Sequence, residues 1–218
     1  MKLISVNVSR PKTVTWQGER IRTGIFKKPV SGKVQVHRLN LEGDGQADLR
    51  VHGGEDKAVY AYPAEHYAPW QSELGRELPF GQFGENLTVE GMLEDEVGIG
   101  DIFRIGTTLF QVSQPRTPCH KLGIRVDSRA FPRRFLESGR SGFYLRVLEK
   151  GELESGETVH LESREKDRFT VREVCRLLDS EPADLSRMRQ AAELAALSAG
   201  WRNQFRLRLS RASLDTIP

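Results

Sequence analysis

One short segment of the chain brings a thiol together with positively charged side chains. Cys119 follows Pro118, and Arg116, His120 and Lys121 lie close to it in the sequence. Nearby positive charge and a helix N-terminus both favour the thiolate form of cysteine, and a helix is predicted to begin at this point. Such a thiolate can act as a nucleophile or as a ligand for a soft metal. The alternative is an inert cysteine of the core, because cysteine outside disulfides is among the most buried residue types.

The other histidines and cysteines decide little between these roles. His52 and His120 could serve as a general base, but no spacing ties either imidazole to the thiol of Cys119. No H-x-x-x-H or C-x-x-C pair occurs, which argues against a conventional zinc site. The second cysteine, Cys175, lies on the apolar face of a predicted helix and is expected in the core. Two cysteines also cannot form a disulfide framework or a four-cysteine iron–sulfur site.

Three glycine-containing turns carry polar side chains that could contact an anionic ligand. They read RTGIFK at 22–27, VHGGEDK at 51–57 and FGENL at 83–87. Each turn taken alone is explained by turn chemistry, because glycine permits backbone conformations that other residues avoid. Together with Arg116, however, they offer cations for a phosphate and amides or backbone groups for a heterocycle.

Short strands separated by glycine-rich turns are predicted for most of the chain. The predicted strands are 2–8, 13–16, 33–39, 58–62, 102–105, 108–113, 142–148 and 158–162, and the helices between them are 63–74, 119–127 and 128–137. Short strands with irregular spacing favour a barrel or a sandwich over alternating β-α-β units. No G-x-G-x-x-G follows a strand and no Walker A motif occurs.

The C-terminal part has a helical pattern instead. Thr170 and Glu173 form a capping box, and apolar residues then recur at helical spacing. Two further amphipathic helices are predicted after Pro182 and after Ser198. The charged segment 164–168 is predicted to be a linker between a domain at 1–163 and a second at 164–218. The predicted fold class is therefore mainly β (α+β), with a small three-helix appendage.

The composition limits the partners and the compartment. The net charge is +3 with a pI near 8.9, which suits a small anionic ligand but lacks the dense basic stripes of dedicated nucleic-acid-binding proteins. No segment approaches the ~20 apolar residues of a membrane helix. The first apolar run is too short for a signal peptide. A cytoplasmic protein without membrane association is predicted.

Several ordered motifs resemble the MOSC domain family, and within it the YiiM-like group. They read LEGDGQAD at 41–48, VHGG at 51–54, DKAVYAYP at 56–63, EHY at 65–67, FGENLT at 83–88, IGD at 99–101 and QVSQPR at 111–116, followed by Pro118, Cys119, Lys121 and Leu122. The match runs through the whole strand-rich part, and the tail is similar to the three-helix domain that follows MOSC in this group.

The resemblance implies a β-barrel-like MOSC domain that binds the molybdenum cofactor, Mo-molybdopterin, with Cys119 as the molybdenum ligand and catalytic residue. A thiolate suits this metal as a soft ligand. Residue type and motif position then predict cofactor contacts from Arg22, Lys27 and Arg116 to the phosphate, and from Thr23, His52, Asn86 and Ser113 to the pterin or the phosphate.

The resemblance also implies reduction of N-hydroxylated compounds, and in this group of N-hydroxylated purine bases such as 6-hydroxylaminopurine. Two cysteines are too few for an iron–sulfur cluster and no nucleotide-binding motif occurs, so electrons are expected from a separate flavin or iron–sulfur reductase. The tail helices could form part of the docking surface for that reductase or could cover a barrel edge. The alternative function is a non-catalytic carrier of the cofactor, or a protein that transfers sulfur to it.

Overall fold

A large mixed sheet organises the first three quarters of the chain in the computed structural model, which describes residues 1–48, 53–179 and 184–214. Within these residues, the sheet has eight strands in the order β12 (Val159–Ser163), β8 (Ile102–Ile105), β9 (Thr108–Pro115), β10 (Phe143–Glu149), β6 (Val59–Pro63), β7 (Leu87–Glu90), β1 (Lys2–Val8) and β4 (Lys28–Val30). Only β6 and β7 pair in parallel among the described strands of this sheet.

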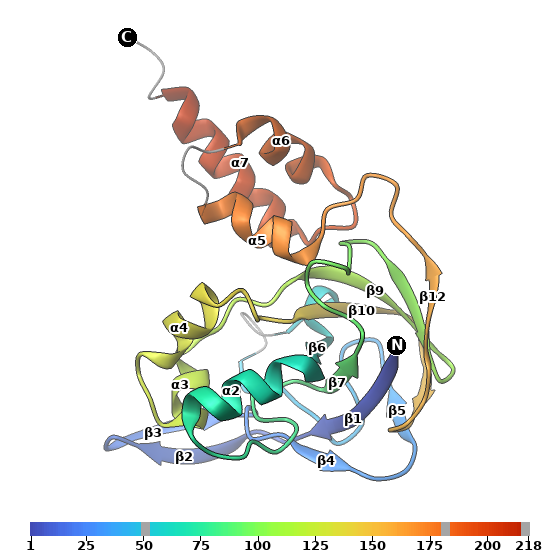
Figure 1. The fold of residues 1–218 in the computed structure, drawn as a ribbon, viewed down its shortest axis with the longest axis vertical. Helices are drawn as coiled ribbons and strands as arrows, with labels where there is room; N and C mark the ends of the chain where they lie inside the picture. Colours follow the sequence, from blue (N-terminus) through green and yellow to red (C-terminus); the bar gives the residue numbers. More distant parts are fainter. Residues whose placement is uncertain (49–52, 180–183, 215–218) are drawn as a thin grey trace.

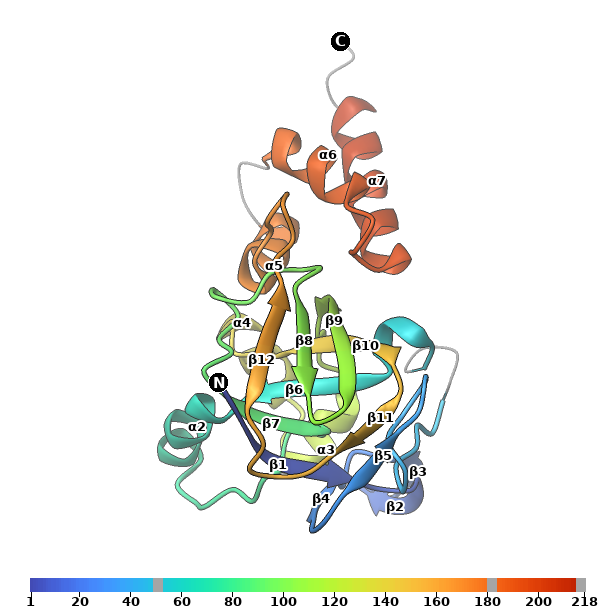
Figure 2. The same cartoon turned by 90° about the vertical axis from the view of Figure 1, so that its right-hand side faces the viewer.

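Backbone hydrogen bonds join β1, the next-to-last strand of this order, to β12 at the other end and to the segment before it, so the sheet closes on itself. The amide of Leu3 donates to the carbonyl of Glu157 (2.9 Å), and the amide of Gly156 donates back to the carbonyl of Leu3 (2.7 Å). The amide of Val159 donates to the carbonyl of Met1 (3.1 Å). These bonds place the start of β1 beside β12, and Figure 2 shows the strands wrapped around a common interior. Closure leaves few exposed edges for pairing with other chains.

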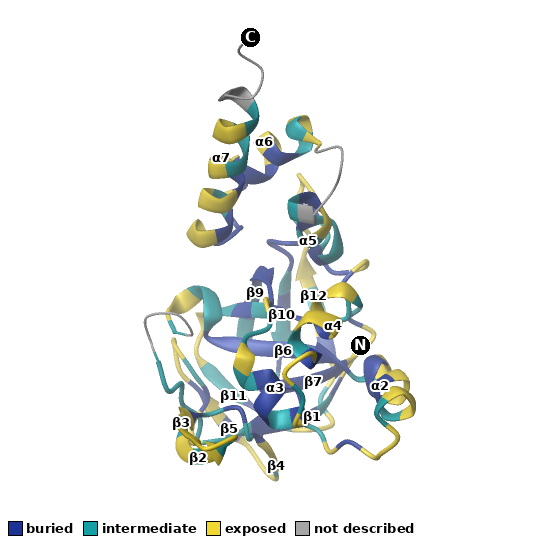
Figure 3. Cartoon of the chain, turned by 90° about the vertical axis from the view of Figure 1, so that its left-hand side faces the viewer, coloured by how far each residue is buried: buried dark blue, intermediate teal, exposed yellow. Residues whose placement is uncertain are grey.

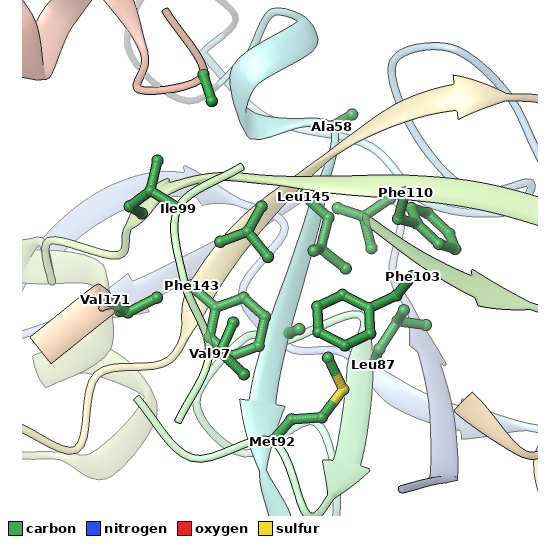
Figure 4. Packing of buried hydrophobic residues seen from close by; sticks show 14 of the residues in the cluster. Ala58, Leu87, Met92, Val97, Ile99, Phe103, Phe110, Phe143, Leu145 and Val171 are labelled. Atoms are coloured by element: carbon green, nitrogen blue, oxygen red, sulfur yellow. The ribbon is translucent and has the colours of Figure 1, made fainter. Parts of the chain in front are cut away.

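Strand β6 supports two separate cores because both of its faces are covered. Successive side chains of a strand point to opposite faces. Val59 and Ala61 accordingly lie in the barrel core, whereas Tyr60 and Tyr62 lie in a second, largely aromatic core outside the barrel. Figure 4 shows side chains of the barrel core, including Phe103 of β8, converging from several strands.

Three helices cover the outer, aromatic core. They are α2 (Tyr67–Leu74), α3 (His120–Val126) and α4 (Phe131–Glu137), and short 3-10 turns at Glu55–Lys57 and Ala64–His66 precede and follow β6. Trp70 of α2 stacks on Phe135 of α4, with ring centroids 5.7 Å apart. Figure 3 shows the buried faces of these helices turned towards the barrel. The helices thereby hold the end of β9 and the start of α3 in place.

Two small antiparallel sheets complete the barrel region. They are the hairpin β2 (Lys12–Trp16) with β3 (Glu19–Thr23), and the pair β5 (Val34–Val36) with β11 (Gly151–Leu153). The hairpin turns through Gln17 (φ 51°) and Gly18 (φ 84°). Positive φ at both central residues is the geometry that keeps two short strands twisted together.

The C-terminal region consists of α5 (Val171–Asp179), α6 (Leu185–Glu193) and α7 (Ala199–Leu214), which lie at one end of the barrel (Figure 1). The amide of Glu173 donates to the hydroxyl of Thr170 (3.1 Å), as the predicted capping box requires at its first position. Val171 and Val174 belong to the same hydrophobic core as the barrel strands. The amphipathic helices therefore pack against the barrel.

The predicted fold class is confirmed, namely a mainly β, barrel-like domain followed by three helices. Four short strands, β3, β4, β7 and β11, were not among the predicted ones. The predicted linker at 164–168 is held to the barrel region, because the amide of Glu165 donates to Asp101 (3.1 Å) and Arg168 donates to the carbonyl of Glu96. The division at 163/164 stays a prediction. Over the described residues, no helix is long and apolar enough to cross a membrane.

Candidate functional site

The segment after β9 places Cys119 between two hollows of the surface. Strand β9 ends at Pro115, and Cys119 caps the start of α3 with an extended backbone (φ −117°, ψ 170°). Its side chain is half-buried. It lines a cavity on the barrel side and also a second hollow that α7 borders. The thiol therefore lies where two groups could approach it from different directions.

The first of these, called here the cationic cavity, carries four basic side chains on its wall. These are Lys27, Lys57, Arg116 and Lys121. Thr23, Asn86 and Tyr144 contribute polar groups, and the backbone segments 24–25, 45–47 and 83–84 complete the lining together with Tyr60, Thr117 and Cys119. The enclosed volume is about 100 Å³, which suits a compact anionic group and leaves the rest of a larger cofactor outside. Converging cations and hydroxyl or amide groups are typical of phosphate recognition.

Arg116 is the most informative of these cations because it is buried without enough partners. Only 6% of the residue is exposed. Its guanidinium carbon lies 5.1 Å from the ring centroid of Tyr60 and 5.2 Å from that of Phe135. Nη2 donates weakly to the carbonyl of Phe83 (3.4 Å), whereas the buried Nη1 has no partner among the described residues. A buried charged donor left unpaired is destabilising, so this nitrogen is suited to donate a hydrogen bond to an oxygen of a bound anion.

Lys27 is held in the cavity by an internal ion pair. Its ammonium group binds the carboxylate of Asp44, which also accepts from the side-chain amide of Asn86 (2.9 Å) and from the backbone amide of Ser9 (2.9 Å). Burial lowers the pKa of Lys27, and the charge of Asp44 opposes that shift. Asp44 therefore anchors two of the predicted contact residues, while its negative charge is satisfied within the protein.

Close backbone packing forms the floor of the cationic cavity. A side chain at Gly24 would bring its Cβ within 2.4 Å of the carbonyl oxygen of Gly45. At Gly84 (φ +84°) a Cβ would lie 2.8 Å from the side chain of Ile25. Glycine is thus required at Gly24 and Gly84 because neighbouring protein segments approach them closely.

A buried carboxylate organises the turn that carries Phe83, Gly84 and Asn86. Glu85 accepts from the backbone amides of Gly81 (2.8 Å) and Phe83 (3.0 Å) and from the hydroxyl of Tyr67. Burial raises the pKa of Glu85, while these donors oppose that shift. Glu85 does not line the cavity. Its contacts are those of a residue that positions the turn.

The predicted site residues fall into three groups. Thr23, Lys27, Asn86, Arg116 and Cys119 are brought together on the wall of the cationic cavity. Their contacts with a cofactor stay predictions.

Arg22 and Ser113 are not among the lining residues. Arg22 is exposed on β3, and the hydroxyl of Ser113 is engaged with the main chain, 2.7 Å from the carbonyl oxygen of Asp56 and 3.0 Å from that of Tyr144. Their placement gives no support to the predicted cofactor contacts. His52 lies outside the described residues.

Among the residues of the cavity wall that sequence reasoning did not assign to the site, three carry polar or charged groups of special interest. Lys57 and Lys121 were part of quoted motifs, yet neither was assigned to the site, and Tyr144 lies far away in the sequence on β10. Lys121 could have been found from its position close to Cys119, and Lys57 from its place in the turn at 51–57, whereas Tyr144 had no local signal. Among the described residues, no group of three His, Cys, Asp or Glu side chains is arranged to hold a metal ion.

Comparisons with known proteins agree with this architecture. Residues 48–160 match the MOSC domain family, and residues 169–212 match the YiiM-like three-α-helix domain. YflK of Bacillus subtilis (strain 168) is 43% identical over 203 residues, which cover 93% of this chain and 92% of YflK. A protein of Gibberella moniliformis (strain M3125 / FGSC 7600) named as a reductase is 33% identical over 196 residues, covering 88% of this chain and 35% of that protein.

A solved structure extends the agreement to three dimensions. The crystal structure of YiiM from Geobacillus stearothermophilus matches with a TM-score of 0.81 and 38% identity, covering 95% of this chain and 98% of that one. Both the barrel and the helical region are thus shared with a protein of known structure. The chain belongs to the MOSC domain family and carries the three-helix domain of its YiiM-like members.

Proposed function

We propose that this protein is a molybdenum-cofactor-dependent reductase of N-hydroxylated compounds, with N-hydroxylated purine bases as the favoured substrates. The observation that carries the proposal is the unpartnered, buried Nη1 of Arg116 in a cavity that also holds Lys27, Lys121 and the thiol of Cys119. This set of groups matches a ligand that combines a phosphate with a soft metal. Association of MOSC domains with the molybdenum cofactor supports the same reading.

The residues of the cationic cavity divide the binding task by their chemistry. Arg116 and Lys27 would hold the phosphate, and Thr23 and Asn86 would bind through a hydroxyl and an amide. Cys119 would ligate the metal through its thiolate, whose electron donation tunes the redox potential of a bound metal. In this assignment Cys119 would be the protein ligand of the metal, and the other residues of the cavity wall would hold the rest of the cofactor.

The bound cofactor would supply two-electron, oxygen-removing chemistry that no amino-acid side chain provides. The overall reaction is R–NH–OH plus two electrons and two protons, giving R–NH₂ and water. Here the N–O bond breaks, the nitrogen is reduced, and the hydroxyl oxygen leaves as water. The reductase name of the Gibberella moniliformis relative supports reduction as the reaction class. The electrons would come from a separate flavin or iron–sulfur reductase, which the proposal includes as a partner.

The deciding experiment uses the full chain, loaded with molybdenum cofactor during expression. Reduced methyl viologen serves as electron donor and 6-hydroxylaminopurine as substrate, and adenine formation is measured by chromatography. We expect adenine to form, and we expect Cys119→Ser to abolish turnover. Cys175→Ser is the matched control, because Cys175 on α5 is also half-buried, packs against the hydrophobic core and does not line the cationic cavity.

Two results would overturn the proposal. Protein that never acquires molybdenum or pterin under cofactor supply removes the cofactor from the account. Protein that acquires both but leaves 6-hydroxylaminopurine, amidoximes and N-oxides unchanged is a carrier or a sulfur-transfer protein, which is the alternative function. Full activity in Cys119→Ser would remove this thiol from the reaction.

A further inference from the structure

The second hollow beside Cys119 lies between the barrel and the first turns of α7. It is called here the α7 hollow, and its volume of about 620 Å³ is in the range of small-molecule sites. Gln114 and Tyr144 line it from the barrel, and Trp201 and Gln204 line it from α7. Cys119 belongs to the wall of both hollows. The two hollows also share Lys57, Thr117 and Tyr144, so a molecule in the α7 hollow would lie next to the cationic cavity and within reach of the thiol.

Polar contacts hold the start of α7 against the barrel, so the wall of this hollow has a defined position. The amide of Ser198 donates to the carbonyl of Ser113 on β9 (3.0 Å). The guanidinium of Arg146 on β10 donates to the carbonyl of Ala196 (2.7 Å) and also binds Asp56. The helical region is thus fixed to the two strands that lead to Cys119 and Tyr144.

The chemistry of the α7 hollow suits a neutral, planar ligand. Its lining carries three charged side chains: Glu55 and Asp56, which are paired with Arg38 and Arg146, and Lys57, which it shares with the cationic cavity. The indole of Trp201 offers an aromatic surface. Amide side chains can donate and accept at once, which is the pattern that the edge of a nitrogen heterocycle requires. The cationic cavity, by contrast, offers mainly positive charge.

We propose that the α7 hollow binds the substrate as a neutral nitrogen heterocycle, with Gln204 of α7 as a residue that determines specificity. The inference rests on the proposed function for the role of Cys119, but it assigns a distinct site to the helical region. In this arrangement the N-hydroxyl group points to Cys119, and the ring lies beside Trp201. The three-helix region then contributes to substrate selection besides packing on the barrel.

A glycine in the wall of the hollow provides a sharp test. Gly200 lines the hollow, and a Cβ there would meet no atom within 4 Å, so there is room at this wall for a larger side chain. Glycine is also a poor helix former, so Gly200→Leu and Gly200→Ala should keep or raise the melting temperature. We expect Gly200→Leu to weaken binding of 6-hydroxylaminopurine by at least about tenfold and to lower kcat/KM equally, because it excludes the ligand. Gly200→Ala should stay within about twofold.

The role of the side-chain amide of Gln204 is tested against a control substitution at the neighbouring Asn203. Gln204→Leu should weaken binding of 6-hydroxylaminopurine by about threefold to tenfold, which is the loss of one neutral hydrogen bond. Asn203→Leu makes the same chemical change at an exposed position of α7 outside the lining, and it should leave binding unchanged. Binding is measured by calorimetry on cofactor-loaded protein, independently of turnover.

The outcomes separate this inference from the proposed function. Unchanged binding in Gly200→Leu refutes the α7 hollow as the substrate site, even if the protein reduces the substrate. Loss of molybdenum from Gly200→Leu also refutes it, because the hollow would then hold part of the cofactor. If the wild type binds the base without reducing it and Gly200→Leu does not bind, the reductase function fails and the site stands. If the wild type neither binds nor reduces the base, both fail.

Discussion

Replacing Arg116 by methionine separates a binding role from a structural one. Methionine keeps the unbranched, apolar stem and removes the guanidinium. In the protein as it stands, that group contacts the rings of Tyr60 and Phe135 at 5.1 and 5.2 Å and leaves Nη1 buried without a partner in the described chain. The substitution therefore removes favourable contacts and an unfavourable burial at the same time.

The magnitudes of these effects predict a small change in stability and a large loss of cofactor affinity. Two cation–π contacts contribute about 0.5–2 kcal/mol each, whereas an unpaired buried donor costs about 1–3 kcal/mol. The two effects largely offset each other, so the free energy of unfolding of cofactor-free protein should change by no more than about 3 kcal/mol in Arg116→Met. A hydrogen bond to a charged group contributes about 1.5–3 kcal/mol, so affinity for the phosphate-bearing cofactor should fall by about 10- to 150-fold.

The assay combines urea unfolding of cofactor-free protein with titration of isolated molybdenum cofactor into the same preparations. Arg116→Lys is the matched comparison, because it keeps a charge but loses the planar fork, and its affinity should lie between the other two. The reasoning is refuted if Arg116→Met binds the cofactor like the wild type. It is equally refuted if the free energy of unfolding falls by more than about 4 kcal/mol, because the guanidinium would then be structural.

Three further substitutions test the supports of the site. Burial raises the pKa of Glu85 above its ordinary value of 4.5, so the fold favours the protonated side chain. The stabilisation that Glu85 contributes is therefore complete below about pH 4.5 and is lost as the pH rises through the pKa of the folded state. The advantage of wild type over Glu85→Gln in urea unfolding should hence shrink as the pH rises above about 4.5, and a difference that stays constant with pH would contradict this. Gly24→Ala should lower the free energy of unfolding by about 1–3 kcal/mol, because its Cβ would lie 2.4 Å from the carbonyl oxygen of Gly45; an unchanged urea midpoint would be the wrong result. Arg146→Met should destabilise by about 1–3 kcal/mol and speed amide hydrogen exchange in α6 and α7 through loss of the bond to Ala196, whereas slow exchange there would show that the bond is dispensable.

Much of the fold could be predicted because strand patterns and glycine turns are local signals. Strands β1 and β8 coincide with the predicted ranges 2–8 and 102–105. Strand β7 has only four residues and follows the turn that Glu85 organises, so its partner strands rather than its own pattern make it a strand. Closure of the barrel depends on bonds between residues about 150 positions apart, such as Leu3 and Glu157, and no local pattern encodes these.

The site was only partly predictable for a related reason. Arg22 and Thr23 are neighbours on β3, and in a strand neighbouring side chains face opposite ways. Thr23 is buried in the cavity wall while Arg22 is exposed, and residue type alone could not choose between them. Ser113 is likewise a suitable ligand by type, but its hydroxyl is bound to main-chain oxygens that come close only in the folded barrel. Arg116 was predictable because its segment carries a motif.

Cys119 lines both the cationic cavity and the α7 hollow, and this limits the experiments that can reveal the role of the three helices. Val171 and Val174 of α5 lie in the same core as the barrel strands, so deleting the helical region would expose that core and unfold the protein. Loss of activity after such a truncation would be uninformative, because stability and substrate binding would fail together. Gly200 lies instead on the open wall of the α7 hollow, where added atoms meet no protein atom near the Cβ. Filling the hollow from within is therefore the change that distinguishes a helix that binds substrate from one that only packs.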